Sequence, residues 1–455
     1  MSDAEDPTTF SPAEPTTGEE FEPVEVFPDN DDFDLRPGAD NCYKCSTCDT
    51  NCPVAEVDDD FPGPKFQGPE QWRLTQTDDD YEIDDSITSC SNCLRCDNAC
   101  PSGVPLSQMH NTARGRYVDE QMSKLSVEYI RNRILANYRT SAWMASKVPR
   151  LSTFVMNNSA VRWVMDKALG VPKERDFPAF ATETFQEWWE KRGGADESRR
   201  RARGNRPDDA DPSDYKVAYF HGCYSNYNTT EVGKAMVRVY EELGFEVVVP
   251  EQKCSGTPMF ANGMLDDAER HAKVNVSSMS DLVEEGYDAI ASCTSCSMAL
   301  RREYPELFDI DGIEKVSENT YDSVEYLRIH TDIADRLSEA TVEGDLAEEF
   351  AYHAPCHGRN QGLERQAVEL FADLDGVGIE DVGDSCSGIS GTYGWKSEKY
   401  EISMEIGQPM FDHMEDSAGE TGMTECPTCA MQMEHGTGYD VRHPLELIEA
   451  AIVEA

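Results

Sequence analysis

The sequence predicts an α+β multidomain protein in which a helical unit with two cysteine runs precedes two repeated α/β cysteine-rich modules. Two observations predict this organisation. Near the N-terminus, a run of four cysteines occurs twice with closely matching spacing, the copies lying 48 positions apart. Farther along, four other cysteines recur at offsets of 132 or 133 residues. Short β-rich runs alternate with helical patterns in both copies of this longer repeat, which predicts α/β units. The strands are expected at 217–220, 245–249 and 287–291 in the first copy and at 350–353 and 377–382 in the second, with a helix over 265–284.

Composition favours a folded protein in spite of an extreme charge. The net charge is −48, yet 39% of the 455 residues are hydrophobic, which suffices for two to four domains with buried cores. Only 14 of the 40 cationic residues are lysines. An acidic, lysine-poor surface suits a cytoplasm of molar salt, where a screening length of about 3 Å weakens self-repulsion. We infer an extremely halophilic source, and the same charge disfavours nucleic acid as a partner.

The first 38 residues are rich in Asp, Glu, Pro and Thr and contain few aliphatic side chains. Such a stretch buries too little apolar surface to offset its ordering, so we predict a disordered acidic tail at 1–38, with an acidic docking arm as the alternative. We expect no secretory signal, because the N-terminus lacks an apolar core. We also expect no membrane-spanning helix, because the chain has no run of 18 apolar residues.

The two cysteine runs predict a ferredoxin-type 2[4Fe-4S] domain over residues 39–118. Each run ends in Cys-Pro, and its spacing is typical of ligands to iron–sulfur clusters, whose fourth cysteine reaches the other cluster. Zinc is the alternative, although zinc motifs rarely combine these gaps with Cys-Pro. We therefore predict two crossed ligand sets: Cys42, Cys45, Cys48 and Cys100 for cluster 1, and Cys52, Cys90, Cys93 and Cys96 for cluster 2.

Residues 119–214 are predicted as a basic, amphipathic helical region followed by a linker. Between Asn111 and Arg206 there are 19 Lys and Arg against 11 Asp and Glu, and four of the six tryptophans lie here. Basic residues among aromatic ones suit an interfacial helix on anionic lipid. The alternative is a helical segment packed on its own domain or on a partner subunit. The polar stretch 193–211 is interpreted as an interdomain linker.

The long repeat defines two cysteine-rich modules, at 215–345 and 346–455. Ligands gather at the carboxyl ends of parallel strands, so cysteines that follow strands should converge into one site per module. We expect an iron–sulfur cluster in each, with structural zinc as the alternative. Nearby His221, His353 and His357 are interpreted as supporting or packing residues, and four glycines as sites of close backbone approach to a cluster (Gly256, Gly388, Gly391 and Gly394). The predicted ligands are Cys223, Cys254, Cys293 and Cys296 in module 1, and Cys356, Cys386, Cys426 and Cys429 in module 2.

Other cofactor motifs are missing from the sequence. There is no G-x-G-x-x-G after a predicted strand, no phosphate-binding loop and no H-E-x-x-H. We therefore expect this chain to move electrons that another polypeptide supplies, and we assign it no catalytic residue.

The order of these parts resembles iron–sulfur subunits of heterodisulfide reductases and of lactate and glycolate oxidation. Shorter runs are similar to the family of the C subunit of anaerobic glycerol-3-phosphate dehydrogenase, among them Phe220-His-Gly-Cys-Tyr-Ser-Asn-Tyr-Asn228 and Gly388-Ile-Ser-Gly-Thr-Tyr-Gly-Trp-Lys396. This resemblance covers about residues 40–455. It implies a complex with two other subunits, a flavoprotein (the A subunit) and a B subunit. It also implies electron transfer to membrane quinone and attachment to the cytoplasmic face of the membrane.

The sequence departs from that family at one position of each module. The family's modules usually contain Cys-Cys-Gly, whereas this chain has Ser255 and Ser387 in place of the second cysteine. Related modules use five cysteines for a noncubane cluster, so with four we expect at most an ordinary cubane in each. Two other hypotheses stay open: a catalytic reductase that cleaves a disulfide or acts on a small substrate, and a repeat that is only a zinc-stabilised docking module.

Overall fold

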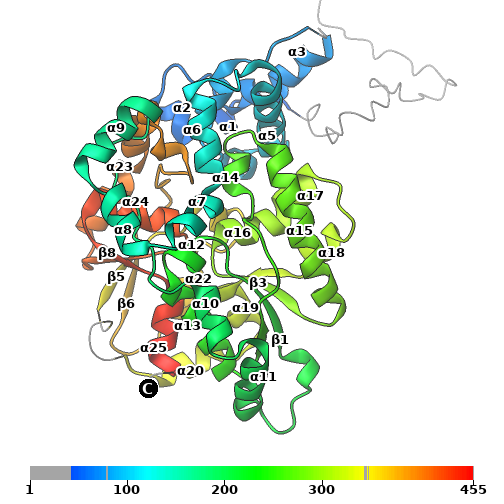
Figure 1. The fold of residues 1–455 in the computed structure, drawn as a ribbon, viewed down its shortest axis with the longest axis vertical. Coiled ribbons are helices and arrows are strands. Elements are labelled where there is room, and N and C mark those ends of the chain that lie inside the picture. Colours follow the sequence, from blue (N-terminus) through cyan, green and yellow to red (C-terminus); the bar gives the residue numbers. More distant parts are fainter. Residues whose placement is uncertain (1–41, 78–79, 343–345, 347, 454–455) are drawn as a thin grey trace, which may run out of the picture. The chain divides into compact units, whose positions relative to one another are not determined.

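The structure is a computed structural model that describes residues 42–77, 80–342, 346 and 348–453. The predicted tail at 1–38 lies outside these residues. The α+β class is confirmed: helices dominate the described part, and the strands form two small parallel sheets (Figure 1). In the residues described here, no helix combines the length and the apolar character needed to cross a membrane.

The N-terminal cysteine runs lie among short helices. Pro53 begins the helix after the first run, at a position where proline is favoured. A longer helix occupies Leu106–Arg116, and Pro69 lies inside a π-helical turn. The helices are α1 (Thr47–Thr50), α2 (Pro53–Val57), η2 (Phe66–Glu70), α3 (Gln71–Thr77), η3 (Asp85–Ser89), α4 (Arg95–Ala99), α5 (Leu106–Arg116) and η4 (Tyr117–Gln121).

Six further helices cover the basic region. They are α6 (Val127–Ala136), α7 (Tyr138–Ala145), α8 (Pro149–Met156), α9 (Ser159–Leu169), α10 (Phe185–Lys191) and α11 (Gly194–Asn205). The interpretation of 193–211 as a linker was wrong, because most of this stretch is helix α11. Ser198 and Ala202 on this helix are fully buried, and the Ser198 hydroxyl accepts a hydrogen bond from the backbone N–H of Val247 at 3.0 Å.

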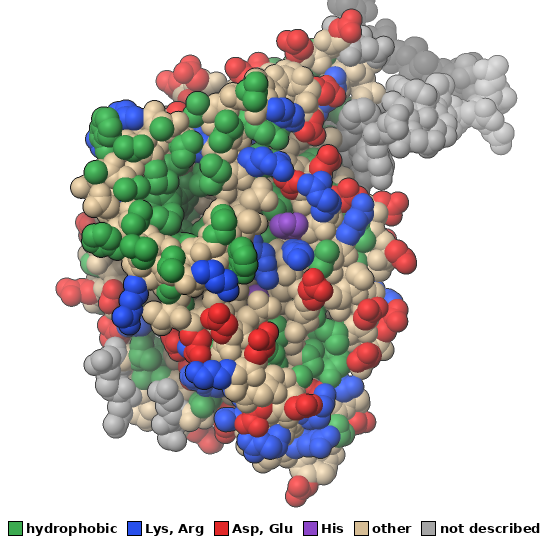
Figure 2. Space-filling view, viewed as in Figure 1, with side chains coloured by type: hydrophobic (Ala, Val, Ile, Leu, Met, Phe, Trp, Pro, Cys, Tyr) green, Lys and Arg blue, Asp and Glu red, His purple; other side chains and the backbone are tan. Residues whose placement is uncertain are grey.

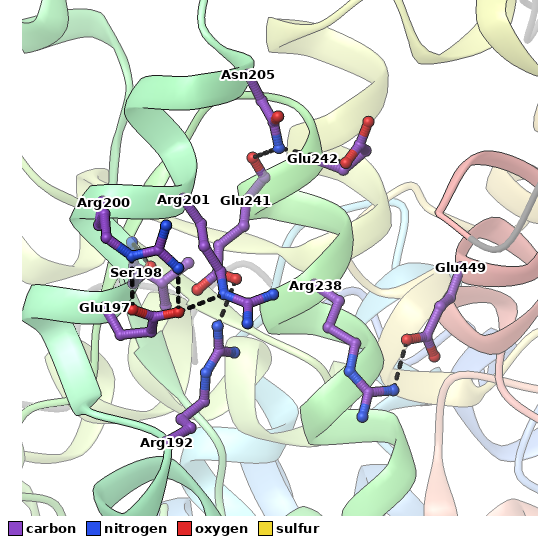
Figure 3. A network of polar contacts seen from close by, with 11 residues as sticks. Arg192, Glu197, Ser198, Arg200, Arg201, Asn205, Arg238, Glu241, Glu242 and Glu449 are labelled. Carbon is purple, nitrogen blue, oxygen red and sulfur yellow. Dashed lines mark hydrogen bonds and ion pairs between the residues drawn. The ribbon is translucent and has the colours of Figure 1, made fainter.

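Ion pairs explain why such a polar stretch is helical (Figure 3). Glu197 in the first turn of α11 pairs with Arg200 at 2.6 Å and with Arg201 at 2.7 Å, the spacing at which helical side chains meet. These arginines hold the pKa of Glu197 at about 2. Beside them, Arg192 forms a largely buried 2.6 Å ion pair with Glu241. Arg199 of α11 also pairs with Glu246 at 3.2 Å, so charges in the supposed linker join this helix to a neighbouring segment.

Module 1 contains a four-stranded parallel sheet with the order β2-β1-β3-β4. Its three strands nearest the N-terminus occur where the sequence predicts them, and β4 is an additional short strand. The strands are β1 (Lys216–Phe220), β2 (Glu246–Val248), β3 (Asp288–Ala291) and β4 (Thr320–Asp322). The helices are α12 (Tyr224–Tyr227), α13 (Thr230–Glu242), α14 (Thr257–Phe260), α15 (Leu265–Glu284), α16 (Thr294–Met298), η6 (Ala299–Glu303), α17 (Tyr304–Leu307), α18 (Ile313–Glu318), α19 (Ser323–His330) and α20 (Ile333–Glu339).

Module 2 repeats this topology with the order β6-β5-β7-β8. Even the register repeats, because Tyr219 pairs with Ile290 in module 1 and Tyr352 with Met423 in module 2, each shifted by 133 residues. The strands are β5 (Glu349–Tyr352), β6 (Gly378–Asp381), β7 (Thr421–Met423) and β8 (Asp440–Arg442). The helices are α21 (Cys356–Arg359), α22 (Gln366–Leu370), η8 (Tyr393–Trp395), η9 (Ser397–Lys399), α23 (Tyr400–Asp416), α24 (Pro427–Thr437) and α25 (Pro444–Ile452).

The two modules share one hydrophobic core. Buried side chains of β1 and α13, such as Tyr219 and Val237, belong to the same cluster as Phe350 on β5 and Ile448 on α25. Burial of this apolar surface favours a fixed arrangement of the two modules. The sheets therefore hold their cysteine-bearing loops at a defined distance from one another.

Candidate functional site

The two N-terminal cysteine loops have the same unusual backbone conformation. Lys44 and Ser46 in the first run have positive φ angles of 57° and 62°, and Asn92 and Leu94 in the second have 58° and 61°. Each residue lies 48 positions from its counterpart, so the conformation repeats with the cysteines. Positive φ is uncommon for residues other than glycine and typically persists where surrounding structure enforces it, often at ligand sites. Only Asn92 is a residue type that signals this conformation in a sequence.

The loops gather their cysteines around two small cavities. One has a volume of about 20 Å³ and is lined by Cys42, Cys45, Cys48 and Cys100. The other has the same size and is lined by Cys52, Cys90, Cys93 and Cys96. The structure thus brings together the same two crossed sets that the spacing predicts. Their role as cluster ligands stays a prediction.

The cavity walls set the protonation of the thiols. Burial raises the pKa of Cys52 to about 12, so this thiol is neutral unless a bound cation replaces its proton. Cys90 differs: against the effect of burial, the charge of Arg114 and a contact with His110 lower its pKa to about 6. Arg114 is itself buried and donates a hydrogen bond to the Cys90 carbonyl at 3.2 Å. The second cavity therefore has a positive charge beside it that suits thiolates.

The repeat cysteines lie beyond the carboxyl ends of strands, as the sequence predicts. Cys223, Cys293 and Cys426 each occupy the position directly before a helix: α12, α16 and α24 respectively. Cys356 begins α21 itself. Helix N-termini favour thiolate over thiol. Hydrogen bonds to neighbouring cysteines and burial nevertheless raise the pKa of Cys223, Cys293 and Cys356 well above its usual value, so these thiols are neutral unless a bound cation replaces their protons.

All eight repeat cysteines line a single cavity of about 170 Å³, so the sets predicted for the two modules adjoin one another. Equivalent cysteines of the two modules meet there. Hydrogen bonds from Cys293 of module 1 and from Cys429 lower the pKa of Cys426 in module 2 well below its usual value. Sequence patterns within one repeat could not reveal this convergence, because it depends on how the two modules pack.

The two serines that replace cysteine also line this cavity. Ser255 and Ser387 are 3% and 2% exposed, and their hydroxyl oxygens lie 3.4 Å and 3.3 Å from the sulfurs of Cys296 and Cys429. Each hydroxyl is therefore placed where a fifth sulfur would be in a Cys-Cys-Gly sequence. The donor set of each module is four thiols and one buried hydroxyl.

The glycines after these serines are required by the protein backbone itself. Gly256 and Gly388 have positive φ angles of 90° and 80°. A side chain on Gly388 would collide with the backbone of α23 at Ser403, and one on Gly256 would press on Phe260. These glycines permit a tight turn and close helix packing, and their close approach to a cluster stays a prediction.

Three buried histidines surround the repeat cysteines. Burial lowers the pKa of both His221 and His353 to about 3, and also lowers that of His357, so the imidazoles are neutral. His221 and His357 line the large cavity. Within the residues that the structure describes, His221 Nε2 has no hydrogen-bond partner.

The second N-terminal cysteine site is joined to module 2. Cys93 lines both the second small cavity and the large one. Asn360, on the chain just after Cys356, donates a hydrogen bond to the Cys93 carbonyl at 3.1 Å. Arg95 donates to the Asp384 carbonyl at 2.7 Å, two residues before Cys386. Nothing in the sequence signals these contacts, which place consecutive cysteine sites next to one another.

These donor sets fit iron–sulfur clusters. Cysteine sulfur is the dominant donor, and backbone N–H groups of Val104 and Gly388 each point to a cysteine sulfur at 3.4 Å, as is common around clusters. Among the described residues, no three His, Cys, Asp or Glu side chains form a group that could hold a single metal ion. The chemistry that bound clusters supply is one-electron transfer.

Comparison with known families defines the class. The 4Fe-4S dicluster domain matches residues 38–104, and the cysteine-rich domain matches twice, at 217–301 and 350–434. The chain is thus an iron–sulfur protein with a dicluster domain and a duplicated cysteine-rich domain. It is 33% identical over 424 residues to the C subunit of anaerobic glycerol-3-phosphate dehydrogenase from Escherichia coli K12, covering 91% of this chain and 98% of that protein. The chain belongs to this family.

Two more distant relatives each match about half of the chain. The B subunit of fumarate reductase (CoM/CoB) from Methanothermobacter marburgensis is 31% identical over 248 residues, 52% of this chain and 46% of that protein. Lactate utilization protein A of an Exiguobacterium strain is 27% identical over 246 residues, 52% of this chain and 96% of that protein. The family resemblance that the motifs indicate is therefore confirmed, together with the wider relationship to iron–sulfur subunits.

Proposed function

We propose that this chain is the electron-transfer and membrane-anchoring subunit of an anaerobic glycerol-3-phosphate dehydrogenase. Its partners are a flavoprotein (the A subunit), which oxidises glycerol 3-phosphate to dihydroxyacetone phosphate, and a B subunit. The chain passes the electrons to membrane quinone. The observation that carries this proposal is Cys93, which lines both the second small cavity and the large repeat cavity. The cysteine sites therefore adjoin one another from the dicluster domain to the repeat.

The proposed ligands are those that the spacing predicts. Two [4Fe-4S] clusters occupy the small cavities, held by the crossed sets that begin at Cys42 and at Cys52. One further iron–sulfur cluster occupies each side of the large cavity, with zinc as the alternative there. The contacts around Cys93 support a step from the second small cavity to module 2. We place the first small cavity before this step and module 1 after it.

Counting metals tests this assignment. The measurement is iron, acid-labile sulfide and zinc per chain on anaerobically purified protein in high salt. About sixteen irons, four per cubane, are expected if all four sites hold clusters. About eight irons with about two zincs would contradict it, since the repeat would then serve only as a docking module.

The membrane-facing surface is proposed to lie on helices α6–α9. Large apolar side chains are exposed across it, with Lys147, Arg150 and Lys167 among them, and Figure 2 shows such side chains gathered on one part of the molecule. Exposed apolar patches on this scale mark interaction surfaces, and interspersed cations favour anionic lipid. The exposed residues are Leu125, Val127, Ile130, Ile134, Trp143, Met144, Val148, Leu151, Phe154, Val155, Trp163 and Val164.

Co-sedimentation of the full chain with liposomes of anionic lipid tests the membrane surface. The variant Leu151→Asp/Phe154→Asp should lose most of its binding, because two charges would enter the lipid interface. Ile329 is 61% exposed and lies on α19, outside these helices, so Ile329→Asp is the matched control and should bind like the wild type. Equal binding of all three proteins would contradict the assignment and favour coverage of this surface by a partner subunit.

The substrate side of the proposal has a definite alternative. The relatives in lactate utilization leave open a complex that oxidises lactate or glycolate. The fumarate reductase relative leaves open a heterodisulfide-reductase-like complex. The purified complex should reduce quinone with glycerol 3-phosphate as donor. Reduction with lactate or glycolate in its place would favour the alternative, and disulfide reduction by the isolated chain with reduced dye would favour a catalytic reductase.

A further inference from the structure

We propose that the apolar wall of the large cavity is the quinone-binding site, an inference that rests on the proposed function. The cavity has two kinds of lining. Cysteines, serines and histidines of the two modules form one part, and apolar residues of the basic helical region and of η8 form another. Leu135, Tyr138, Phe177, Pro178 and Trp395 make up this apolar wall.

The apolar wall suits a flat conjugated ring. Tyr138 stacks on Tyr224 with ring centroids 5.2 Å apart and an interplanar angle of 13°. Phe177 contacts Trp395 with centroids 5.0 Å apart. Ligand sites for such rings are typically lined by aromatic and aliphatic side chains with few polar groups. The wall therefore presents the aromatic side chains of Tyr138, Phe177 and Trp395 to the cavity.

The wall is continuous with the proposed membrane-facing surface. Leu135 and Phe177 pack in the same cluster as Met165 and Leu169 on α9. Ile134 on α6 is 47% exposed, and Trp163 on α9 is 54% exposed. Figure 2 shows a hollow within this apolar surface. A molecule with a lipid-soluble tail could therefore enter from the bilayer while its tail stays among apolar side chains.

The other side of the cavity is where electrons arrive. Tyr224 directly follows Cys223, so a ring held against the Tyr138–Tyr224 pair lies beside a cysteine site. His221 lines the same cavity, and its Nδ1 lies 2.7 Å from the Gly222 carbonyl. With Nδ1 as the donor of that bond, Nε2 is left with a lone pair. A hydroxyl of the reduced ring supplies the hydrogen bond that this nitrogen lacks.

The redox balance is complete with the proposed reaction. Glycerol 3-phosphate loses two electrons and two protons as its secondary alcohol becomes the ketone of dihydroxyacetone phosphate. The quinone gains two electrons, delivered through the cysteine sites, and two protons from water, and its carbonyl groups become the hydroxyls of the quinol. No further oxidant or reductant is needed.

The test uses the complete complex and a short-chain quinone as acceptor, with dye reduction on the same sample as the reference. Leu135→Trp fills the wall and should raise the KM for quinone about tenfold relative to the dye-normalised wild type, the scale of a misfit in an apolar pocket. Ile329→Trp, outside the cavity, is the control and should match the wild type. A photoreactive azidoquinone should label residues 135–138 or 177–178.

The outcomes separate the two proposals. If the wild type reduces dye but no quinone, both the proposed acceptor and the proposed quinone site are wrong. If the wild type reduces quinone while Leu135→Trp keeps its KM and the label maps elsewhere, only the location is wrong. Should Leu135→Trp lose its iron, Phe177→Leu gives the same comparison with a smaller change in volume, and an unchanged KM would again overturn the site.

Discussion

The two cysteine-containing regions of this chain are built in opposite ways. In the dicluster domain, each set of four cysteines lines its own small cavity, and strained loops hold the sulfurs. In the repeat, eight cysteines from two sheets line one cavity about eight times larger, and part of its wall belongs to the basic helices. The first region separates its sites from one another, whereas the second joins its sites to an apolar space.

This difference matches two tasks in electron transfer. A site that only passes electrons works best when shielded from solvent and from other molecules, because burial and fixed hydrogen bonds set its potential. A site that delivers electrons to a separate molecule must leave room for that molecule. Cys93 lies where the two designs meet, so it joins the separate small sites to the open cavity.

The largest effect is expected when a cysteine of a small cavity is removed. Cys42→Ser and Cys100→Ser should each lose the same cluster, because both residues line the first cavity. We expect a loss of about four irons per chain and a fall in quinone-linked activity of at least about 100-fold. Electron paramagnetic resonance of the reduced protein identifies which signal disappears.

Cys52→Ser is the matched comparison for this pairing. Cys52 lies four residues after Cys48 but lines the second cavity. Cys52→Ser should therefore abolish the resonance signal of the second cluster. If Cys52→Ser and Cys48→Ser abolished the same signal, the crossed assignment would be wrong.

Much of this comparison could be predicted from the sequence. The cysteine spacing and its 48-residue and 133-residue repeats predict which cysteines belong together and that they follow strands. Strands over 217–220 and 350–353 and the helix over 265–284 agree with the structure to within one residue. These patterns succeed because hydrophobic periodicity and ligand spacing are local properties of the chain.

Other features could not be predicted, because they depend on contacts between distant residues. The helix α11 looks like a linker by composition, and its order comes from ion pairs and from the buried Ser198 and Ala202. The single large cavity requires the two modules to pack with Cys293 facing Cys426. The positive φ of Leu94 has no signal in its residue type.

The next largest effect concerns the serine that stands in place of a fifth cysteine in module 2. Ser387→Cys adds a fifth sulfur to module 2, because the serine oxygen already lies 3.3 Å from Cys429. We expect an altered resonance signal from module 2, unchanged total iron and a change in quinone-linked rate of less than about tenfold. Ser387→Ala is the control that removes the hydroxyl without adding a ligand. If the two variants gave identical spectra, position 387 would have no role in the site.

A smaller effect concerns the charge beside the second small cavity. The buried Arg114 contacts the loop of Cys90, and a positive charge there stabilises the more negative, reduced form of the site. Arg114→Gln should therefore lower the midpoint potential, by about 60 mV if the lost interaction is about 1.4 kcal/mol. A redox titration followed by resonance measures it. Arg116→Gln, two residues along α5 and paired with Glu120, should leave that potential unchanged. Equal potentials in all three proteins would show that Arg114 does not tune the site.

The smallest effect tests whether the cysteine loops of the small cavities are held under backbone strain. Lys44 is exposed and has a φ of 57°, a conformation that costs an L-residue with a Cβ about 1 kcal/mol but costs glycine little. Lys44→Gly should therefore unfold at a higher temperature than Lys44→Ala, and its free energy of unfolding should be larger by up to about 1 kcal/mol. Elsewhere glycine normally destabilises a chain relative to alanine. Anaerobic thermal unfolding of both variants in high salt makes the comparison at one position, so the loss of the lysine charge cancels. If alanine proved as stable as glycine, the left-handed loop would carry no strain, and the contrast with the repeat would rest on the cavities alone.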